Sequence, residues 1–188
     1  VGVAMFKRRV GGVVVGVLKW KDKGLSPFSD KLRKDKELHS LLLKRGIKPA
    51  ALPLLIDSQA TKANIEKAIR EAAQSADADA VFYFYYAGHG VKGGNEAYVA
   101  NYDIQTSNNA ATGLSIKRIA QLIAENFKGK TVIFTGDFCY SGAFQDAHAV
   151  GRTGGPSDAD DQALAHLAAP STCCSSPDWY ISIMMSEP

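Results

Sequence analysis

Short apolar runs alternate with longer amphipathic stretches along this chain. Runs rich in β-branched or aromatic residues predict buried strands at residues 13–18, 80–86 and 131–135. The run at 80–86 is apolar or aromatic throughout, which indicates a strand covered on both faces. A run at 52–56 is broken by Pro53, and residues 97–100 and 181–185 are candidates for further short strands.

Three stretches between these runs have the apolar spacing of amphipathic helices. They cover residues 30–45, 62–73 and about 115–127. Gly46 ends the first, and Thr61 and Ser115 are suitable N-caps for the others. The inward positions are Leu32, Leu38, Leu41 and Leu42, then Ile65, Ala68 and Ile69, then Ile116, Ile119, Leu122 and Ile123.

Strands that alternate with helices predict an α/β fold with a mostly parallel sheet between helix layers. Glycine, proline and small polar residues predict loops at 21–29, 88–94 and 151–161. A short helix at 163–169 is the remaining element that the pattern favours.

Composition narrows the class of protein without naming a function. A length of 188 residues suits one domain, and 46% hydrophobic with 22% charged residues is typical of a globular chain. The net charge of +3 is too small to indicate a nucleic-acid or membrane-surface partner. The apolar run at 13–18 is too short to span a membrane. Three cysteines form no complete disulfide framework, which favours a reducing, cytoplasmic location.

Two predicted strands are followed by residues whose side chains can take part in catalysis. Strand 80–86 is followed by Ala-Gly-His89-Gly, and strand 131–135 by Gly-Asp-Phe-Cys139-Tyr-Ser-Gly. In a parallel sheet, sites form beyond the carboxyl ends of the strands, so His89 and Cys139 meet if these strands are neighbours. An imidazole beside a thiol can activate it as a nucleophile and protonate a leaving amine. Alone, each residue would be an ordinary loop histidine or a buried cysteine; together they indicate a site.

Neighbouring residues fit the same chemistry. The backbone amides of Gly90 and Cys139 are candidates for holding a developing oxyanion. Asp137 lies two residues before Cys139, so the two side chains point to the same side at a strand end. Asp137 and Asp35 could form an acidic wall for a basic substrate side chain. The simpler alternatives are an Asx-type turn at Asp137 and a helix-dipole contact at Asp35.

Other chemistries have weaker support. Cys173-Cys174 has no zinc-ligand spacing, and residues 77–79 lack the pattern of an EF-hand. A Gly-x-Ser-x-Gly elbow and a phosphate-binding loop are both missing from the sequence. We therefore expect no metal site, and the Cys–His chemistry requires no cofactor.

These motifs resemble those of the caspase-like cysteine peptidases, nearest to metacaspases and bacterial caspase-like proteins. The matching segments are Tyr-Tyr-Ala-Gly-His-Gly at 85–90, Asp-Phe-Cys-Tyr-Ser-Gly at 137–142, Lys-Asp-Lys-Glu-Leu at 34–38 and Ile-Asp-Ser-Gln-Ala-Thr at 56–61. Cys139 follows His89 by about 50 residues, the separation typical of caspases. The similarity covers roughly residues 13–144.

The resemblance implies a caspase-like three-layer sandwich, with a mostly parallel sheet of about six strands flanked by helices. It implies that His89 is the general acid and base and that Cys139 is the nucleophile of an endopeptidase. Asp137, and less directly Asp35, match positions with which metacaspases bind a basic P1 residue, the residue before the cleaved bond. Protein or peptide substrates cut after Arg or Lys are therefore expected.

The sequence also departs from the family pattern. Metacaspases usually have Ser where Ala87 stands, and the chain stops soon after the large-subunit-like part of the domain. We treat residues 1–188 as one catalytic domain whose small-subunit part is short or missing, which self-association or a partner chain could supply. Arg152, in the 151–161 loop, is a candidate processing site or else a solvated loop residue. Some metacaspases need calcium, but no calcium site is identifiable here.

The alternative from another functional class is an inactive caspase-like module that serves as a binding or assembly platform. The short C-terminal part favours it. The presence of both His89 and Cys139 argues against it, because inactive relatives of enzymes commonly lose one catalytic residue.

Overall fold

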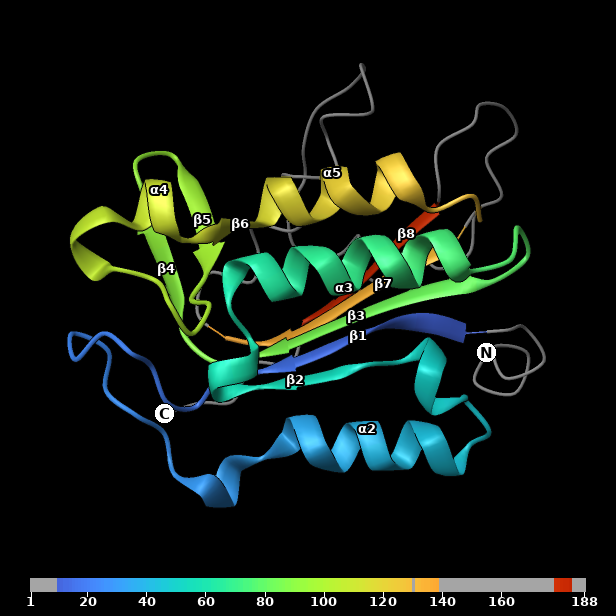
Figure 1. Cartoon of the computed structure of the whole chain (residues 1–188), viewed down its shortest axis with the longest axis horizontal. Helices are drawn as coiled ribbons and strands as arrows, with labels where there is room; N and C mark the ends of the chain where they lie inside the picture. The colour runs from blue at the N-terminus through green and yellow to red at the C-terminus, as the bar shows by residue number, and fades with distance from the viewer. Residues whose placement is uncertain (1–9, 130, 139–177, 184–188) are drawn as a thin grey trace, which may run out of the picture.

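A five-stranded, wholly parallel sheet forms the centre of the described molecule (Figure 1). The computed structural model describes residues 10–129, 131–138 and 178–183. The strand order is β2-β1-β3-β7-β8. The bounds are β1 Val10–Gly16, β2 Leu54–Ile56, β3 Val81–Ala87, β7 Thr131–Asp137 and β8 Asp178–Ile183. The predicted α/β class is confirmed, with five strands of the sheet within the described residues.

Helices cover both faces of this sheet and complete a three-layer sandwich. Figure 1 shows α3 (Lys62–Ser75) and α5 (Ile116–Asn126) on one face and α2 (Lys34–Lys44) on the other. The predicted caps are confirmed, because Thr61 accepts a hydrogen bond from the Asn64 amide and Ser115 accepts one from the Arg118 amide. These bonds satisfy amides that the first turn of each helix leaves unpaired.

The core is divided by the sheet into two apolar clusters. Phe82, Phe84 and Tyr86 of β3 face α3 and α5, where the rings of Phe84 and Phe134 lie 5.1 Å apart. Tyr83 and Tyr85 face α2. All seven residues of β3 are buried, which confirms the strand predicted to be covered on both faces.

Three local predictions need correction. The helix predicted over 30–45 is divided at Arg33 into a 3-10 turn, η1 (Asp30–Leu32), and α2. Leu41 does not face the core, because it is 50% exposed. The predicted loop at 88–94 contains a strand, β4 (Gly90–Gly93).

β4 belongs to a small antiparallel sheet with β5 (Glu96–Val99) and β6 (Leu114–Ser115), at the end of the main sheet where its strands finish (Figure 1). The remaining short elements are η2 Pro49–Ala51, η3 Asp57–Gln59, η4 Thr106–Asn108 and α4 Asn109–Thr112. Among the described residues, no helix is both long and apolar enough to cross a membrane.

Candidate active site

The two motif-bearing strands finish side by side. β3 pairs with β7 in parallel register, with Ala87 opposite Asp137. Immediately beyond this pair, the Gly88 amide donates a hydrogen bond to the Asp137 carbonyl at 3.2 Å. The predicted adjacency of the strands is therefore confirmed. His89 lies two residues past Ala87, whereas Cys139 lies outside the described residues.

Gly88 makes the turn that carries His89 away from β3. Its φ is +154°, a conformation that residues with a side chain rarely adopt. A Cβ atom at this position would lie 2.5 Å from Tyr86 Oη and 2.7 Å from the Val17 carbonyl oxygen. The turn therefore depends on glycine for both its backbone conformation and its close packing.

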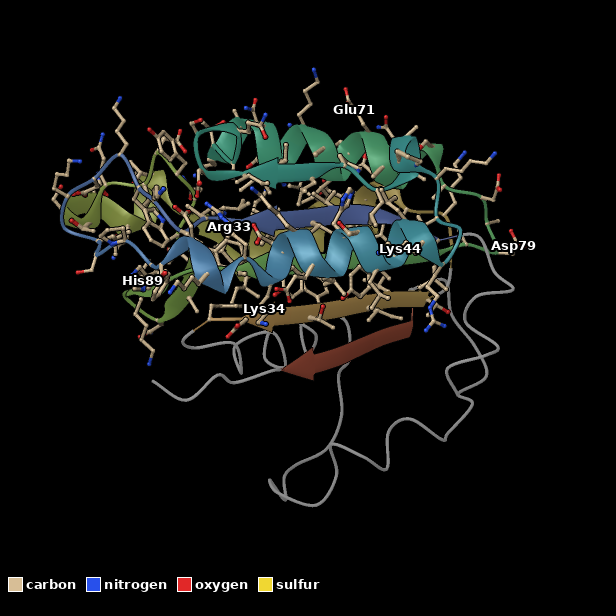
Figure 2. All side chains as sticks on the ribbon, turned by 90° about the horizontal axis from the view of Figure 1, so that it is seen from below. Arg33, Lys34, Lys44, Glu71, Asp79 and His89 are labelled. Atoms are coloured by element: carbon tan, nitrogen blue, oxygen red, sulfur yellow. The ribbon has the colours of Figure 1, made fainter. Side chains whose placement is uncertain are left out.

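The imidazole of His89 packs against two aromatic rings of the loop after β1, which also contact each other. Its ring centroid is 4.6 Å from that of Trp20 and 4.3 Å from that of Phe28. Its Nε2–H donates a hydrogen bond to the Ser26 carbonyl at 2.9 Å. Because a carbonyl oxygen can only accept, Nε2 carries the proton in this bond, and Nδ1 is left as the nitrogen that can exchange a proton with a reactant. Figure 2 shows His89 at this end of the sheet.

Hydrogen bonds to its carbonyl oxygen fix the backbone of His89. The His89 carbonyl accepts from Tyr86 Oη at 3.0 Å and from the Ala100 amide at 2.9 Å. The Ala100 carbonyl accepts from Trp20 Nε1 at 2.7 Å and from Tyr86 Oη at 3.0 Å. Three separate segments thus converge on the histidine.

Sequence reasoning missed Trp20, Ser26 and Phe28 as neighbours of His89. The loop predicted at residues 21–29 is confirmed. No local pattern connects this loop to a histidine that follows Ser26 by 63 residues. Trp20 gives the one usable signal, because an aromatic ring this large is rarely left in solvent and its indole N–H needs an acceptor when buried.

The two acidic candidates lie on the same side of the sheet. Tyr83 Oη and Thr135 Oγ1 are 2.6 Å apart, so Thr135 faces α2, and Asp137 faces the same way two residues later. Asp35 comes from α2 and is fully buried. Burial first, and then the negative charges of Asp137 and Asp35, raise the pKa of the Tyr85 phenol between them. Asp35 Oδ2 already accepts a hydrogen bond from Arg33 Nη1 at 3.1 Å.

The other predicted site residues stay predictions. Gly90 begins β4 opposite Val99, next to His89, as an oxyanion donor would require. Cys139, with its amide, and Arg152 lie outside the described residues. Within the part of the chain that the structure describes, no group of three or more His, Cys, Asp or Glu side chains could hold a metal ion.

Comparison with known proteins assigns the family. A profile of the caspase domain matches residues 34–182, which is most of this chain. The chain therefore belongs to the caspase-domain family, a family of cysteine peptidases, as its motifs indicated. No curated protein matches the chain in sequence.

Solved structures share the fold at low sequence identity. A structural-genomics target from Geobacter sulfurreducens is 17% identical, with a TM-score of 0.54 over 73% of this chain and 55% of that one. The structure of pro-sf-caspase-1 is 14% identical, with a TM-score of 0.55 over 96% of this chain and 61% of that one. These similarities confirm the caspase-like sandwich, and the chain spans less than two thirds of either protein.

Proposed function

We propose that this member of the caspase-domain family is a cysteine endopeptidase that cleaves after Arg or Lys with His89 and Cys139. The observation that carries the proposal is the placement of His89. It follows the strand next to the one that leads to Cys139, and its Nε2 is bound by the Ser26 carbonyl. Nδ1 is then the nitrogen that takes part in proton transfer.

In acylation, Nδ1 of His89 accepts the thiol proton of Cys139, and the thiolate attacks the carbonyl carbon of the substrate. Amides of Gly90 and Cys139 stabilise the negative charge on the former carbonyl oxygen. The tetrahedral intermediate then collapses and breaks the C–N bond. His89 returns its proton to the leaving amine, so a thioester on Cys139 and a free amine result.

In deacylation, His89 removes a proton from a water molecule that attacks the thioester carbon. The C–S bond breaks, the carboxylic acid leaves, and the thiolate regains its proton from His89. The Ser26 carbonyl and the rings of Trp20 and Phe28 support both stages, because they contact the imidazole and restrict its orientation.

Preference for a basic P1 residue follows from Asp137 and Asp35. Asp137 ends β7 two residues before Cys139 in the sequence, and the Asp35 carboxylate lies on the same side of the sheet. Within the described part of the chain, one oxygen of the buried Asp35 carboxylate has no hydrogen-bond partner. An anionic subsite attracts guanidinium or ammonium groups and repels the Asp side chain that caspases accept.

The test is cleavage of fluorogenic peptides that differ only in P1, as Arg, Lys or Asp, with and without calcium. Wild type should cleave the Arg and Lys peptides, and Cys139→Ala and His89→Ala should each lower kcat/KM by at least about 10³-fold. Cys173→Ala and His39→Ala are matched controls that should retain activity. Activity retained in Cys139→Ala would refute the cysteine mechanism, and cleavage after Asp would refute the role of Asp137.

Folded wild type that cleaves none of these peptides would favour the alternative function, an inactive platform for binding or assembly. A thiol-reactive peptide inhibitor separates the two functions, because an inert module should not react at Cys139. We further propose a cytoplasmic location, self-association or association with a small-subunit partner, and processing after Arg152. Calcium would act on activation, since the chemistry itself uses no metal.

A further inference from the structure

An ion-pair cluster around Arg33 lies beside the candidate site, and two of its members, Arg33 and Asp57, have no part in the chemistry described above. Arg33, between η1 and α2, is 9% exposed. Its Nη1 donates to Asp35 Oδ2 at 3.1 Å and to the Gly16 carbonyl at 3.4 Å. Its Nη2 is paired with Asp57 Oδ2. One guanidinium therefore joins α2, the end of β1 and the turn after β2. Figure 2 labels Arg33.

Asp57 connects this cluster to the loop that holds His89. Its φ of +45° is uncommon for a residue other than glycine and is retained where surrounding contacts require it. Oδ1 of Asp57 accepts from the amides of Leu18 at 2.8 Å and Lys19 at 3.2 Å. These residues begin the loop at 17–29, which carries Ser26 and both aromatic neighbours of His89. The same carboxylate thus binds Arg33 and the start of that loop.

Asp35 connects the cluster to the acidic subsite. A Cβ atom on Gly16 would lie only 1.7 Å from Asp35 Oδ2, so the carboxylate fits in this place because residue 16 is glycine. Arg33 binds Oδ2, while Oδ1 and the nearby Tyr85 hydroxyl are both buried and have no hydrogen-bond partner among the residues that the structure describes. Buried polar atoms without a partner are costly, so a pair of them indicates a group that arrives from outside. A substrate guanidinium or ammonium group could bind Oδ1 of Asp35.

We propose that Arg33 and Asp57 are positioning residues that hold the two halves of the active site together. Through Asp35, Arg33 orients the oxygen that receives the basic P1 side chain. Through the amides of Leu18 and Lys19, Asp57 fixes the loop whose Ser26 carbonyl orients His89. This proposal rests on the proposed peptidase function and adds two residues that act on substrate through others.

The guanidinium group is well suited to this position. Its planar fork can bind two carboxylates and a carbonyl at once, whereas a lysine ammonium cannot reproduce that geometry. Removing the positive charge would also bring the buried Asp35 and the half-buried Asp57 into uncompensated repulsion. The effects of changing Arg33 and Asp57 should therefore be strongly coupled.

Steady-state kinetics on full-length variants test the proposal with P1-Arg and P1-Lys peptides. Arg33→Met should raise KM about tenfold with a smaller change in kcat, because Asp35 loses its orientation. Asp57→Asn keeps the side-chain shape but weakens the pair with Arg33, and should lower kcat about tenfold by loosening the loop. The effects are compared in kcat/KM. The loss of kcat/KM in the double variant should be at least about fivefold smaller than the product of the two single losses, because the residues are in contact.

Lys34→Met is the matched control. It removes a positive charge from the next residue along, where Lys34 forms an exposed pair with Glu37 at 3.1 Å. Its kinetic constants should stay within about twofold of wild type. Arg33→Lys keeps the charge and tests the fork alone, and it replaces Arg33→Met if that variant does not fold. It should raise KM about threefold. Unchanged KM in the folded Arg33 variant, or strictly multiplicative effects, would overturn the proposal.

A readout without catalysis separates this proposal from the peptidase function. Wild type that cleaves no basic peptide refutes the proposed function by itself. The coupling between Arg33 and the loop is then judged by hydrogen exchange of the Leu18 amide, which is bonded to Asp57 and makes no hydrogen bond to Arg33. Arg33→Met or Arg33→Lys should accelerate this exchange. An unchanged exchange rate at Leu18 would overturn the coupling.

Discussion

The hydroxyl group of Tyr86 gives a perturbation whose size can be worked out from its contacts. Tyr86 is fully buried, and its one O–H proton is shared between the carbonyls of His89 and Ala100, each 3.0 Å from Oη. In Tyr86→Phe, neither carbonyl loses its last partner. The His89 carbonyl keeps the Ala100 amide at 2.9 Å, and the Ala100 carbonyl keeps Trp20 Nε1 at 2.7 Å.

The expected loss is therefore that of a net hydrogen bond, about 1 kcal/mol of unfolding free energy. An orphaned buried carbonyl would cost up to about 3 kcal/mol, which these remaining bonds prevent. For a domain of this size, the change corresponds to a fall in Tm of about 2–4 °C. If the same free energy supports the position of His89, kcat should fall by no more than about tenfold.

Urea denaturation followed by circular dichroism measures the first effect, and peptide hydrolysis measures the second. Tyr83→Phe is the matched control, because Tyr83 lies on β3 like Tyr86 but on the other face of the sheet. Its hydroxyl is 2.6 Å from Thr135 Oγ1 and does not contact the His89 carbonyl. It should lower stability by a similar amount and leave kcat unchanged. A loss above 3 kcal/mol in Tyr86→Phe, or an equal fall of kcat in both variants, would refute this reasoning.

Three further predictions concern the turn, a loop anchor and the buried phenols. Gly88→Ala should cost about 2 kcal/mol or more in thermal unfolding because of its φ and the close Tyr86 hydroxyl, whereas Gly94→Ala, with open space around it, should cost less; equal costs would contradict this. Hydrogen bonds from the Thr106 amide, the Gly24 amide and the Thr106 hydroxyl lower the pKa of Asp22, so its stabilisation should be complete above the unfolded value of about 3.9 and be lost as pH falls through the lower folded value. The stability difference between wild type and Asp22→Asn should therefore shrink as the pH falls below about 3.9, and a difference that does not change on acidification would contradict this assignment. Burial raises the pKa values of Tyr85 and Tyr86, so the stability contribution of their neutral forms is complete below about pH 10 and is lost as pH rises; tyrosinate absorbance from them should appear only together with unfolding by circular dichroism.

Periodicity predicted the elements whose pattern is local. The inward faces of α3 and α5 are confirmed at Ile65 and Ile119, among others, because helical spacing alone decides which side chains meet the sheet. The rule that parallel sheets carry their sites at the carboxyl ends placed both motifs at one edge but left the adjacency of β3 and β7 as a condition, which the register of Ala87 with Asp137 meets.

Non-local contacts explain what the pattern missed. The glycines of β4 favour a loop locally, and the strand forms because Gly90–Gly93 pairs with β5. The helix expected from residue 30 is interrupted at Arg33, whose side chain binds Asp57 from a distant turn. The position of Ser26 against His89 likewise depends on tertiary packing across 63 residues.

The most direct test of the account is chemical labelling of Cys139 with a chloromethyl ketone peptide that ends in arginine, followed by peptide mapping in a mass spectrometer. Wild type should be labelled at Cys139 in preference to Cys173 and Cys174, an excess of arginine peptide should protect it, and His89→Ala should slow the reaction by at least about a hundredfold. Labelling at Cys139 that is independent of His89, or equal reaction at all three cysteines, would contradict a thiol activated by this histidine.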